Sequence, residues 1–438
     1  MTGPGLAFEQ APPLSVPYRF ALTAPVFGVL AGLLLMWRGP EALASRWSPA
    51  ALALTHLLVL GFITMAMAGA LLQMLPVLAG SPVPRIRLAA WAVHLPLTAG
   101  ALLLPAGFLT GHGGTLLAAV ALLAAAVALL LLVLAVSLAR AAVRSATVSG
   151  MRHAAVGLAA GAGLGIVLAL RHAGIDLLPG IKLTPLHLAW GLLGWVLPLM
   201  MAVAYQVVPM FQLTPAYPAR LSRWLTPALL AGLTLWSLAV LGGAPAAPVL
   251  AAALALACAL FAVATLRLQS LRRRKRLDYT LLFWRLAMAA TVAAALLWAA
   301  LPLLPRRHVE TAAPIIGALA LGGVALSAIT GMLYKIVPFL AWFHLQGLAA
   351  GRWRIPNMKD ALPEPAMRLQ FAWHCAALAI LAAAFAAPEP LARVAGAAIA
   401  VSSALLGRNL ARTARLYRDT RLKIEAITRP GNPALPRD

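Results

Sequence analysis

The sequence predicts an all-α membrane protein with about twelve transmembrane helices in a pseudo-threefold repeat of four helices. Three observations support this fold class: a strongly apolar composition, twelve apolar runs of membrane-crossing length, and a helix-end motif that recurs three times. Because equivalent helices of such a repeat face one another, we expect them to surround shared interior space.

The composition favours a membrane over water. The mean hydropathy is +0.90, 62% of the residues are hydrophobic and 11% are charged, whereas about a quarter are charged in soluble domains. A bilayer accepts this apolar surface, and helices satisfy their own backbone groups there. The polar start runs directly into a full-length span, so we expect no cleaved signal peptide. Cys258 and Cys375 lie in apolar runs and are expected to pack as small hydrophobes.

Apolar runs of about 20 residues, the length that crosses a bilayer as a helix, can be counted along the chain. They cover approximately residues 18–37, 50–79, 87–108, 114–139, 153–175, 184–211, 223–243, 246–266, 281–304, 311–340, 367–387 and 390–407. Grouped in fours, they give repeat units of about 18–145, 150–275 and 280–412. The transmembrane domain would then cover 18–412, between a cytoplasmic segment 1–17 and a basic cytoplasmic tail 413–438.

The recurring motif lies in the second, sixth and tenth predicted spans. In each span a Gly precedes a Pro by fifteen residues: Gly61 and Pro76, Gly194 and Pro209, Gly323 and Pro338. The Gly-to-Gly intervals are 133 and 129 residues. Since a fixed period is typical of repeated architecture, we predict that these three spans converge at the centre of the bundle.

Long polar side chains stand three residues before each of these Pro residues. The predicted set is Gln73, Gln206 and Lys335, with Tyr205 and Tyr334 one position earlier. We expect a small polar ring near the cytoplasmic face. It could admit protons or anions, or Lys335 could simply extend its ammonium group to the lipid headgroups.

Lys and Arg are concentrated in the loops that follow the second, fourth, sixth, eighth and tenth spans. By the positive-inside rule, both termini are expected in the cytoplasm. The formal net charge of +24 then reflects this bias and attraction to anionic lipid. No soluble basic domain is present that would bind nucleic acid, so we exclude that class of function.

The histidines are the candidate site. Five of the nine fall on the expected outer side: His56, His112, His172, His187 and His308. His56 and His187 lie at similar depth in the second and sixth spans. Neutral imidazole ligates haem iron and copper, so we predict these two as cofactor and metal ligands, with His172 and His308 as further candidates. The alternative is that they only form hydrogen bonds near the membrane interface.

Methionines are a second candidate set, because thioethers bind Cu(I) and can ligate haem. Those on the three repeated spans are Met65, Met67, Met74, Met200, Met201, Met210 and Met332. Ordinary packing is the preferred interpretation, since Met commonly fills gaps between helices.

Several segments resemble the NnrS family of bacterial membrane proteins. They are "PYRFALTAPVFGVLAGLLLMW", "THLLVLGF", "AGALLQMLPVLAG" and, at the end of the sixth span, "VVPMF". The resemblance implies an inner-membrane protein of the nitric oxide response that binds haem and copper. In architecture the chain is also similar to the catalytic subunit of heme-copper oxidases. That similarity would place His56 on a haem ligand and His187 near a copper ligand.

The chain departs from the oxidase pattern at decisive positions. Gly191 stands where a Tyr would follow His187 by four residues, and the expected histidines are missing from the seventh and tenth spans. A complete oxygen- or nitric-oxide-reducing centre is therefore not expected, and whether the protein is an enzyme stays open. We expect haem binding near the outer face, with copper as a second metal, in nitric oxide or respiratory-stress physiology. The alternatives are a secondary transporter or channel with a cavity between the second, sixth and tenth spans, and an assembly partner of a respiratory complex.

Overall fold

The computed structural model describes residues 10–141, 143–273, 278–349 and 353–427. Within these ranges the chain forms twelve helices that are long and apolar enough to cross a membrane, as the sequence predicts. The segment 1–9 and the residues after 427 lie outside the described part, so most of the predicted N-terminal segment and the end of the predicted tail do too.

Nine spans are single helices: α1 (Ser15–Arg38), α5 (Ile86–Thr110), α6 (Gly113–Ala139), α7 (Ala146–His172), α10 (Ala219–Leu241), α11 (Ala247–Ser270), α12 (Tyr279–Ala300, extended by η4, Leu301–Leu303), α16 (Glu364–Ala384) and α17 (Pro388–Ile427). The other three are composite: α3 (Pro49–His56), η2 (Leu57–Thr64) and α4 (Met65–Ala79); α8 (Thr184–Ala189), η3 (Trp190–Val196) and α9 (Leu197–Gln212); α13 (Arg306–Ala318), η5 (Leu319–Leu326) and α14 (Ser327–Ala349). Short helices α2 (Glu41–Ala44) and α15 (Met358–Ala361) lie in connections.

The composite helices are the second, sixth and tenth spans, which carry the recurring motif. The middle part of each, η2, η3 and η5, is a π-helix. Each π-helical segment begins four residues before the motif glycine, which is Gly61, Gly194 or Gly323. A π-helix widens the turn and leaves some backbone groups outside the regular α pattern, and such segments are frequent at functional sites.

Small residues bring each composite span close to one neighbouring helix. Gly61 packs on Phe27 of α1, Gly194 on Gly157 of α7, and Gly323 on Ala290 of α12. Eight residues further along, Gly69 packs on Phe20, Ala202 on Gly150, and Gly331 on Phe283. The two partners are thus seven residues apart in α1, α7 and α12 alike. Small residues at helix crossings permit such approaches in membranes.

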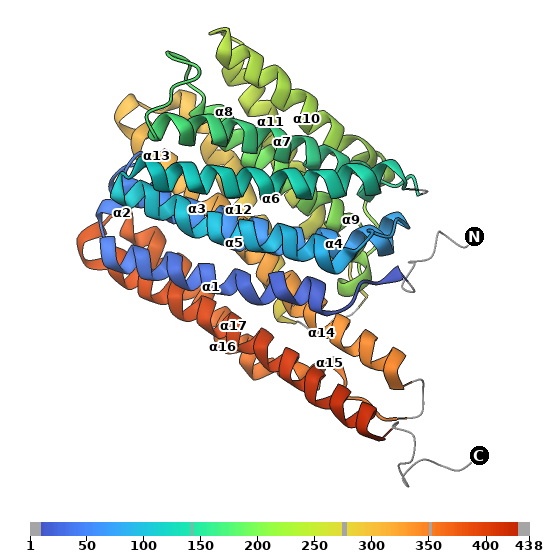
Figure 1. Ribbon diagram of the computed structural model, residues 1–438. Helices are drawn as coiled ribbons and strands as arrows, with labels where there is room; N and C mark the ends of the chain where they lie inside the picture. Colours follow the sequence, from blue (N-terminus) through green and yellow to red (C-terminus); the bar gives the residue numbers. More distant parts are fainter. Residues whose placement is uncertain (1–9, 142, 274–277, 350–352, 428–438) are drawn as a thin grey trace.

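The first and last helices of the chain also pack together. α1 and α17 lie side by side along the bundle, although they come from opposite ends of the sequence (Figure 1). Gly32 and Gly396 meet there, and a Cβ on either would overlap the backbone of the other helix. α6 also contacts α7, and α11 contacts α12. Each predicted group of four spans therefore contacts the next group, and the contact of α1 with α17 joins the last group to the first.

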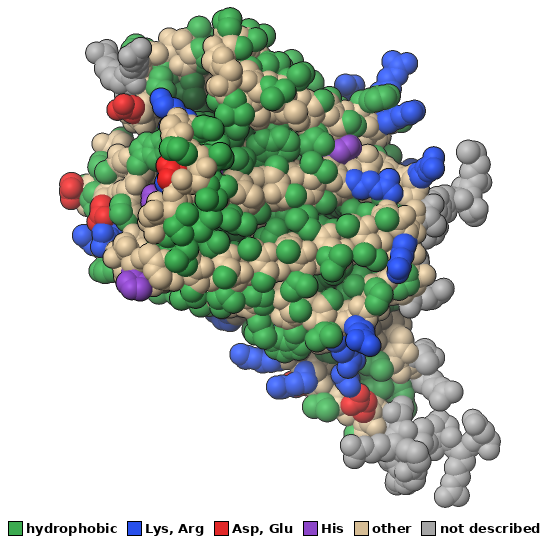
Figure 2. Space-filling view, turned by 45° about the horizontal axis from the view of Figure 1, so that its top comes forward, with side chains coloured by type: hydrophobic (Ala, Val, Ile, Leu, Met, Phe, Trp, Pro, Cys, Tyr) green, Lys and Arg blue, Asp and Glu red, His purple; other side chains and the backbone are tan. Residues whose placement is uncertain are grey.

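A broad apolar surface covers the face of the bundle that Figure 2 shows. Large side chains such as Val249 and Leu296 are 71% and 66% exposed, as expected for a surface that faces lipid. Lys and Arg side chains gather at one end of the bundle (Figure 2). We call this the basic end; the helix ends there include Arg152, Arg220 and Arg267. The opposite end, where α3, α8 and α13 begin, is the histidine end.

The last span is longer than its apolar run suggests. The sequence places its end near residue 407, whereas α17 continues as one helix to Ile427. This extension is polar and carries an ion pair between Arg421 and Glu425, one turn apart, at 2.6 Å. Hydropathy detects only the part that suits lipid, and charged residues spaced by four continue a helix into water.

Candidate histidine site

The structure brings His56 and His187 together. His56 is the last residue of α3, directly before η2, and His187 lies in α8, three residues before η3. Their ring centroids are 6.2 Å apart and their ring planes differ by 11°. Two imidazoles separated by 131 positions in sequence are therefore neighbours with nearly parallel rings.

Backbone carbonyls fix the tautomer of both rings. The Nδ1 of His56 lies 2.8 Å from the carbonyl oxygen of Leu52, and the Nδ1 of His187 lies 2.9 Å from that of Gly161. A carbonyl oxygen only accepts, so each Nδ1 donates its hydrogen and a neutral ring keeps its lone pair on Nε2. Metal-ligating histidines are typically held in this way, with one nitrogen bonded to the protein and the other left for the metal.

Phe108 and Gly165, which the sequence did not indicate as site residues, also lie near the two imidazoles. The ring of Phe108, in α5, lies 5.3 Å from the His56 ring and 5.4 Å from the His172 ring. A Cβ on Gly165, in α7, would come within 2.8 Å of Cε1 of His187. The glycine-rich stretch "GLAAGAGLG" in α7 was an available signal, because glycines in membrane helices often mark a close approach.

Some positions at the histidine end are not closely packed. Both lie deep among protein atoms, yet both keep accessible surface. A Cβ on Gly191, one turn beyond His187, would meet no atom within 4 Å, and the same holds for Gly317 of α13. Continuous burial in η2 and η3 begins only at Gly61 and Gly194. The histidine end of the composite spans is therefore packed more loosely than the part that follows.

A buried hydrogen bond joins η2 to η3 on the basic-end side of the two histidines. Nε1 of Trp195 donates to Oγ1 of Thr64 at 3.3 Å, and both residues are buried. Thr64 follows His56 by eight residues, and Trp195 follows His187 by the same number. This hydrogen bond joins η2 directly to η3, so it helps to hold the two histidine-bearing spans in register.

The other predicted ligands lie at the same end but differ in setting. His172 ends α7 and is exposed, and its ring lies 5.4 Å from that of Phe108. His308 is the third residue of α13 and is also exposed. His112 caps α6 by accepting the amide hydrogen of Thr115. Among the described residues, no group of three or more His, Cys, Asp or Glu side chains is placed to hold a metal ion.

The five residues of the predicted polar ring contact different neighbours. Lys335 pairs with Asp278, with Nζ 3.3 Å from Oδ2. The hydroxyl of Tyr334 accepts from Asn409 of α17, and the Tyr205 ring lies 5.1 Å from the Tyr217 ring. Gln73 is buried and Gln206 is half-buried. Lys335 therefore has a protein counter-ion, and a shared proton or anion function of the five stays a prediction.

The Lys335–Asp278 pair gives a testable stability effect. Asp278→Asn is expected to lower the free energy of unfolding by about 1 kcal/mol, because it removes a half-buried ion pair. Asn can still cap α12, where the carboxylate now accepts the amide hydrogen of Leu281. The measurement is unfolding of the detergent-solubilised protein, with Lys335→Met and the double variant completing a cycle. Equal stability of Asp278→Asn and wild type would contradict the assignment.

The fold and this site define a class, a multi-pass helical membrane protein with two half-buried imidazoles side by side on two of its spans. No model of a known protein family matches the chain, and no curated protein shows a significant match. The resemblance to the NnrS family therefore rests on the sequence segments quoted above.

Proposed function

We propose that this is an integral protein of the bacterial inner membrane that binds haem through His56 and His187. The observation that carries the proposal is the pairing of two nearly parallel imidazoles whose Nδ1 atoms are both bound to carbonyl oxygens. The role in the response to nitric oxide or respiratory stress, and copper as a second metal on the same imidazoles, rest on the family resemblance.

The donor set fits a haem iron. Each imidazole would offer Nε2, because its Nδ1 is bound to a backbone carbonyl oxygen, and neutral imidazole is a common ligand of haem iron. The two rings come from different spans and their centroids lie 6.2 Å apart, so both would be near one bound group.

The chain's own residues have definite tasks in this proposal. The carbonyl oxygens of Leu52 and Gly161 hold the Nδ1 hydrogens and so keep both Nε2 lone pairs available. Phe108 forms an apolar wall at the His56 ring and limits the approach of water. A bound haem would supply iron that changes its oxidation state, and the protein would hold the imidazoles neutral around it. No complete oxygen- or nitric-oxide-reducing centre is included.

We also place the histidine end on the outer side of the membrane. The basic end carries most of the loop Lys and Arg residues, which remain in the cytoplasm by the positive-inside rule. α1 begins and α17 ends at the basic end (Figure 1), so both termini would be cytoplasmic.

A pseudo-threefold arrangement of four-helix units is part of the proposal. The matching offsets of η2, η3 and η5 from their glycines support it. The paired contacts of the composite spans with α1, α7 and α12 support it independently, because each unit repeats them at the same spacing. Such a repeat would bring equivalent spans to one centre, and the contact between His56 and His187 on two of these spans agrees with that.

A transporter or channel is the second candidate, and one observation favours it. The inner parts of the three composite spans, α4, α9 and α14, enclose an apolar cavity. Repeated helices around a central cavity are common in secondary transporters. The cavity has no charged lining, so it favours an uncharged substrate.

The proposed function is tested by absorption spectra of the detergent-purified protein, oxidised and dithionite-reduced, with iron and copper analysis of the same sample. We expect a Soret band, sharp reduced bands typical of two axial histidines, and near-stoichiometric iron. A colourless, metal-free protein from haem-replete cells would overturn the haem proposal and favour the transporter.

Gly165 provides a variant that disturbs the site without removing a ligand. Gly165→Ala places a methyl group against the His187 ring, so we expect several-fold lower haem content in a protein that still elutes as a single folded species. Gly163→Ala is the matched control. Gly163 lies on the same helix, and a Cβ there meets no atom within 4 Å. Equal haem content in both variants would contradict the placement of the haem beside His187.

A further inference from the structure

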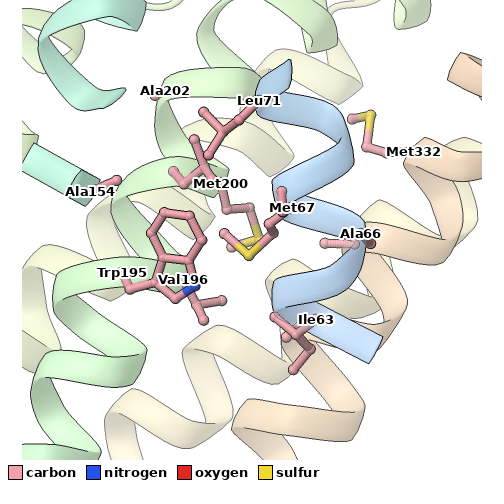
Figure 3. Close-up of a cluster of buried hydrophobic side chains, with 14 of the residues drawn as sticks. Ile63, Ala66, Met67, Leu71, Ala154, Trp195, Val196, Met200, Ala202 and Met332 are labelled. Carbon is pink, nitrogen blue, oxygen red and sulfur yellow. The ribbon is translucent and has the colours of Figure 1, made fainter. Parts of the chain in front are cut away.

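A second space lies on the basic side of the histidine pair. It is a cavity of about 80 Å3 between α4, α9 and α14, and Trp284 of α12 contributes to its wall. The lining residues on the three composite spans include Met67, Met200 and Met332, one from each. Figure 3 shows Met67 and Met200 extending toward one another from α4 and α9. The haem proposal does not use this cavity.

The cavity wall is almost entirely hydrocarbon and thioether. Its lining contains no Asp, Glu, Lys, Arg or His. Thioethers could attract a soft cation such as Cu(I), but the cation would find no counter-charge, and burying an uncompensated charge is costly. Water is also disfavoured, because a buried water molecule needs two to four polar partners. An uncharged apolar molecule is therefore the occupant that the lining suits.

The size of the cavity restricts this occupant further. An engineered apolar cavity of about 150 Å3 stays dry and takes up benzene or xenon. The cavity described here is smaller, at about 80 Å3, so it suits a single xenon atom or a diatomic molecule rather than a lipid tail or a porphyrin. The polarizable sulfur atoms of Met67, Met200 and Met332 would add dispersion attraction.

The nearby polar atom does not open into the cavity. Nε1 of Trp284 is itself buried and has no hydrogen-bond partner among the described residues. A molecule in the cavity would therefore contact almost only carbon and sulfur atoms.

We propose that this cavity binds a small uncharged apolar molecule the size of a diatomic gas, which enters from the bilayer. The hydrocarbon region dissolves such molecules readily, and the cavity lies between spans that cross it. The site is separate from the histidine pair, because the buried Trp195–Thr64 hydrogen bond lies between them along both spans. Its occupancy does not depend on haem.

Xenon is the probe for this proposal. The full-length protein, reconstituted in lipid nanodiscs, is titrated with xenon, and exchange between bound and free xenon is followed by 129Xe NMR, with empty nanodiscs as the lipid baseline. We expect a saturable bound signal above that baseline. Xenon uptake that only matches empty nanodiscs would overturn the proposal.

Variants of lining residues test whether the bound xenon lies in this cavity. Ala70→Leu adds bulk to the lining and should remove the bound signal, whereas Ile329→Ala enlarges the cavity and should increase it. Ala253→Leu, the same change as the first at an exposed position of α11, should behave as wild type. Because Ala70→Leu and Ile329→Ala predict opposite changes, misfolding of one still leaves the other decisive. A bound signal unaffected by both variants would place xenon elsewhere and contradict the assignment.

Discussion

Replacing either His56 or His187 with alanine is expected to abolish the two-histidine haem spectrum. Each change removes one imidazole of a pair whose rings are 6.2 Å apart. Loss of a group that is hydrogen-bonded to a metal-bound histidine typically weakens metal binding by about 10- to 100-fold, so loss of the histidine itself should reduce haem content by at least about tenfold. The measurement is the Soret absorbance per mole of purified protein.

The control for this prediction is another histidine of the same end. His112→Ala removes the cap of α6 but no part of the pair, so its spectrum should match wild type. His56→Gly and His187→Gly leave space for free imidazole, which should restore the low-spin bands when it is added. Full haem content in both alanine variants would exclude the pair as the haem site.

Gly157→Ala should have the largest effect on stability. The added methyl group would overlap the carbonyl group of Gly194, where α7 crosses η3, and neither backbone can move aside as a flexible side chain could. Overpacking usually costs about 1–3 kcal/mol, and we expect at least the upper end of that range. The measurement is thermal unfolding of the purified protein, followed by size-exclusion chromatography.

Gly163→Ala serves again as the matched change, since it alters the same residue type on the same helix where the space is open. Comparing the two variants separates the destabilisation caused by the steric overlap from the difference in helix propensity between Gly and Ala. Equal melting temperatures for Gly157→Ala and Gly163→Ala would show that α7 and η3 do not cross at Gly194.

Hydropathy alone predicted the twelve spans, because a helix that crosses a bilayer needs a certain length and an apolar composition, and both can be read from the sequence. The last apolar run ends near residue 407, whereas α17 continues as a helix to Ile427, since a helix that leaves lipid loses its hydropathy signal but not its backbone hydrogen bonds. The recurring Gly and Pro residues predicted that three spans converge, and in the structure each motif glycine lies at a close contact with a neighbouring helix. The motif did not reveal that a π-helix begins four residues before each of these glycines.

The meeting of His56 and His187 was predicted from their similar depth on two spans of the predicted repeat. Their carbonyl partners could not be predicted, because the oxygens of Leu52 and Gly161 belong to the backbone and leave no mark in the sequence. Phe108 was missed for a related reason. One aromatic ring in an apolar run is indistinguishable from lipid-facing residues until the fold places it against an imidazole.

The contact between α1 and α17 has a consequence for how the chain assembles during synthesis. Gly32 of α1 meets Gly396 of α17, and the guanidinium of Arg393 donates to the carbonyl oxygens of Met36 and Trp37. More than 300 residues separate the two helices in the chain, so α1 is synthesised well before α17. Until α17 has been made, the glycine face of α1 lacks this partner and lies against lipid or an insertion factor.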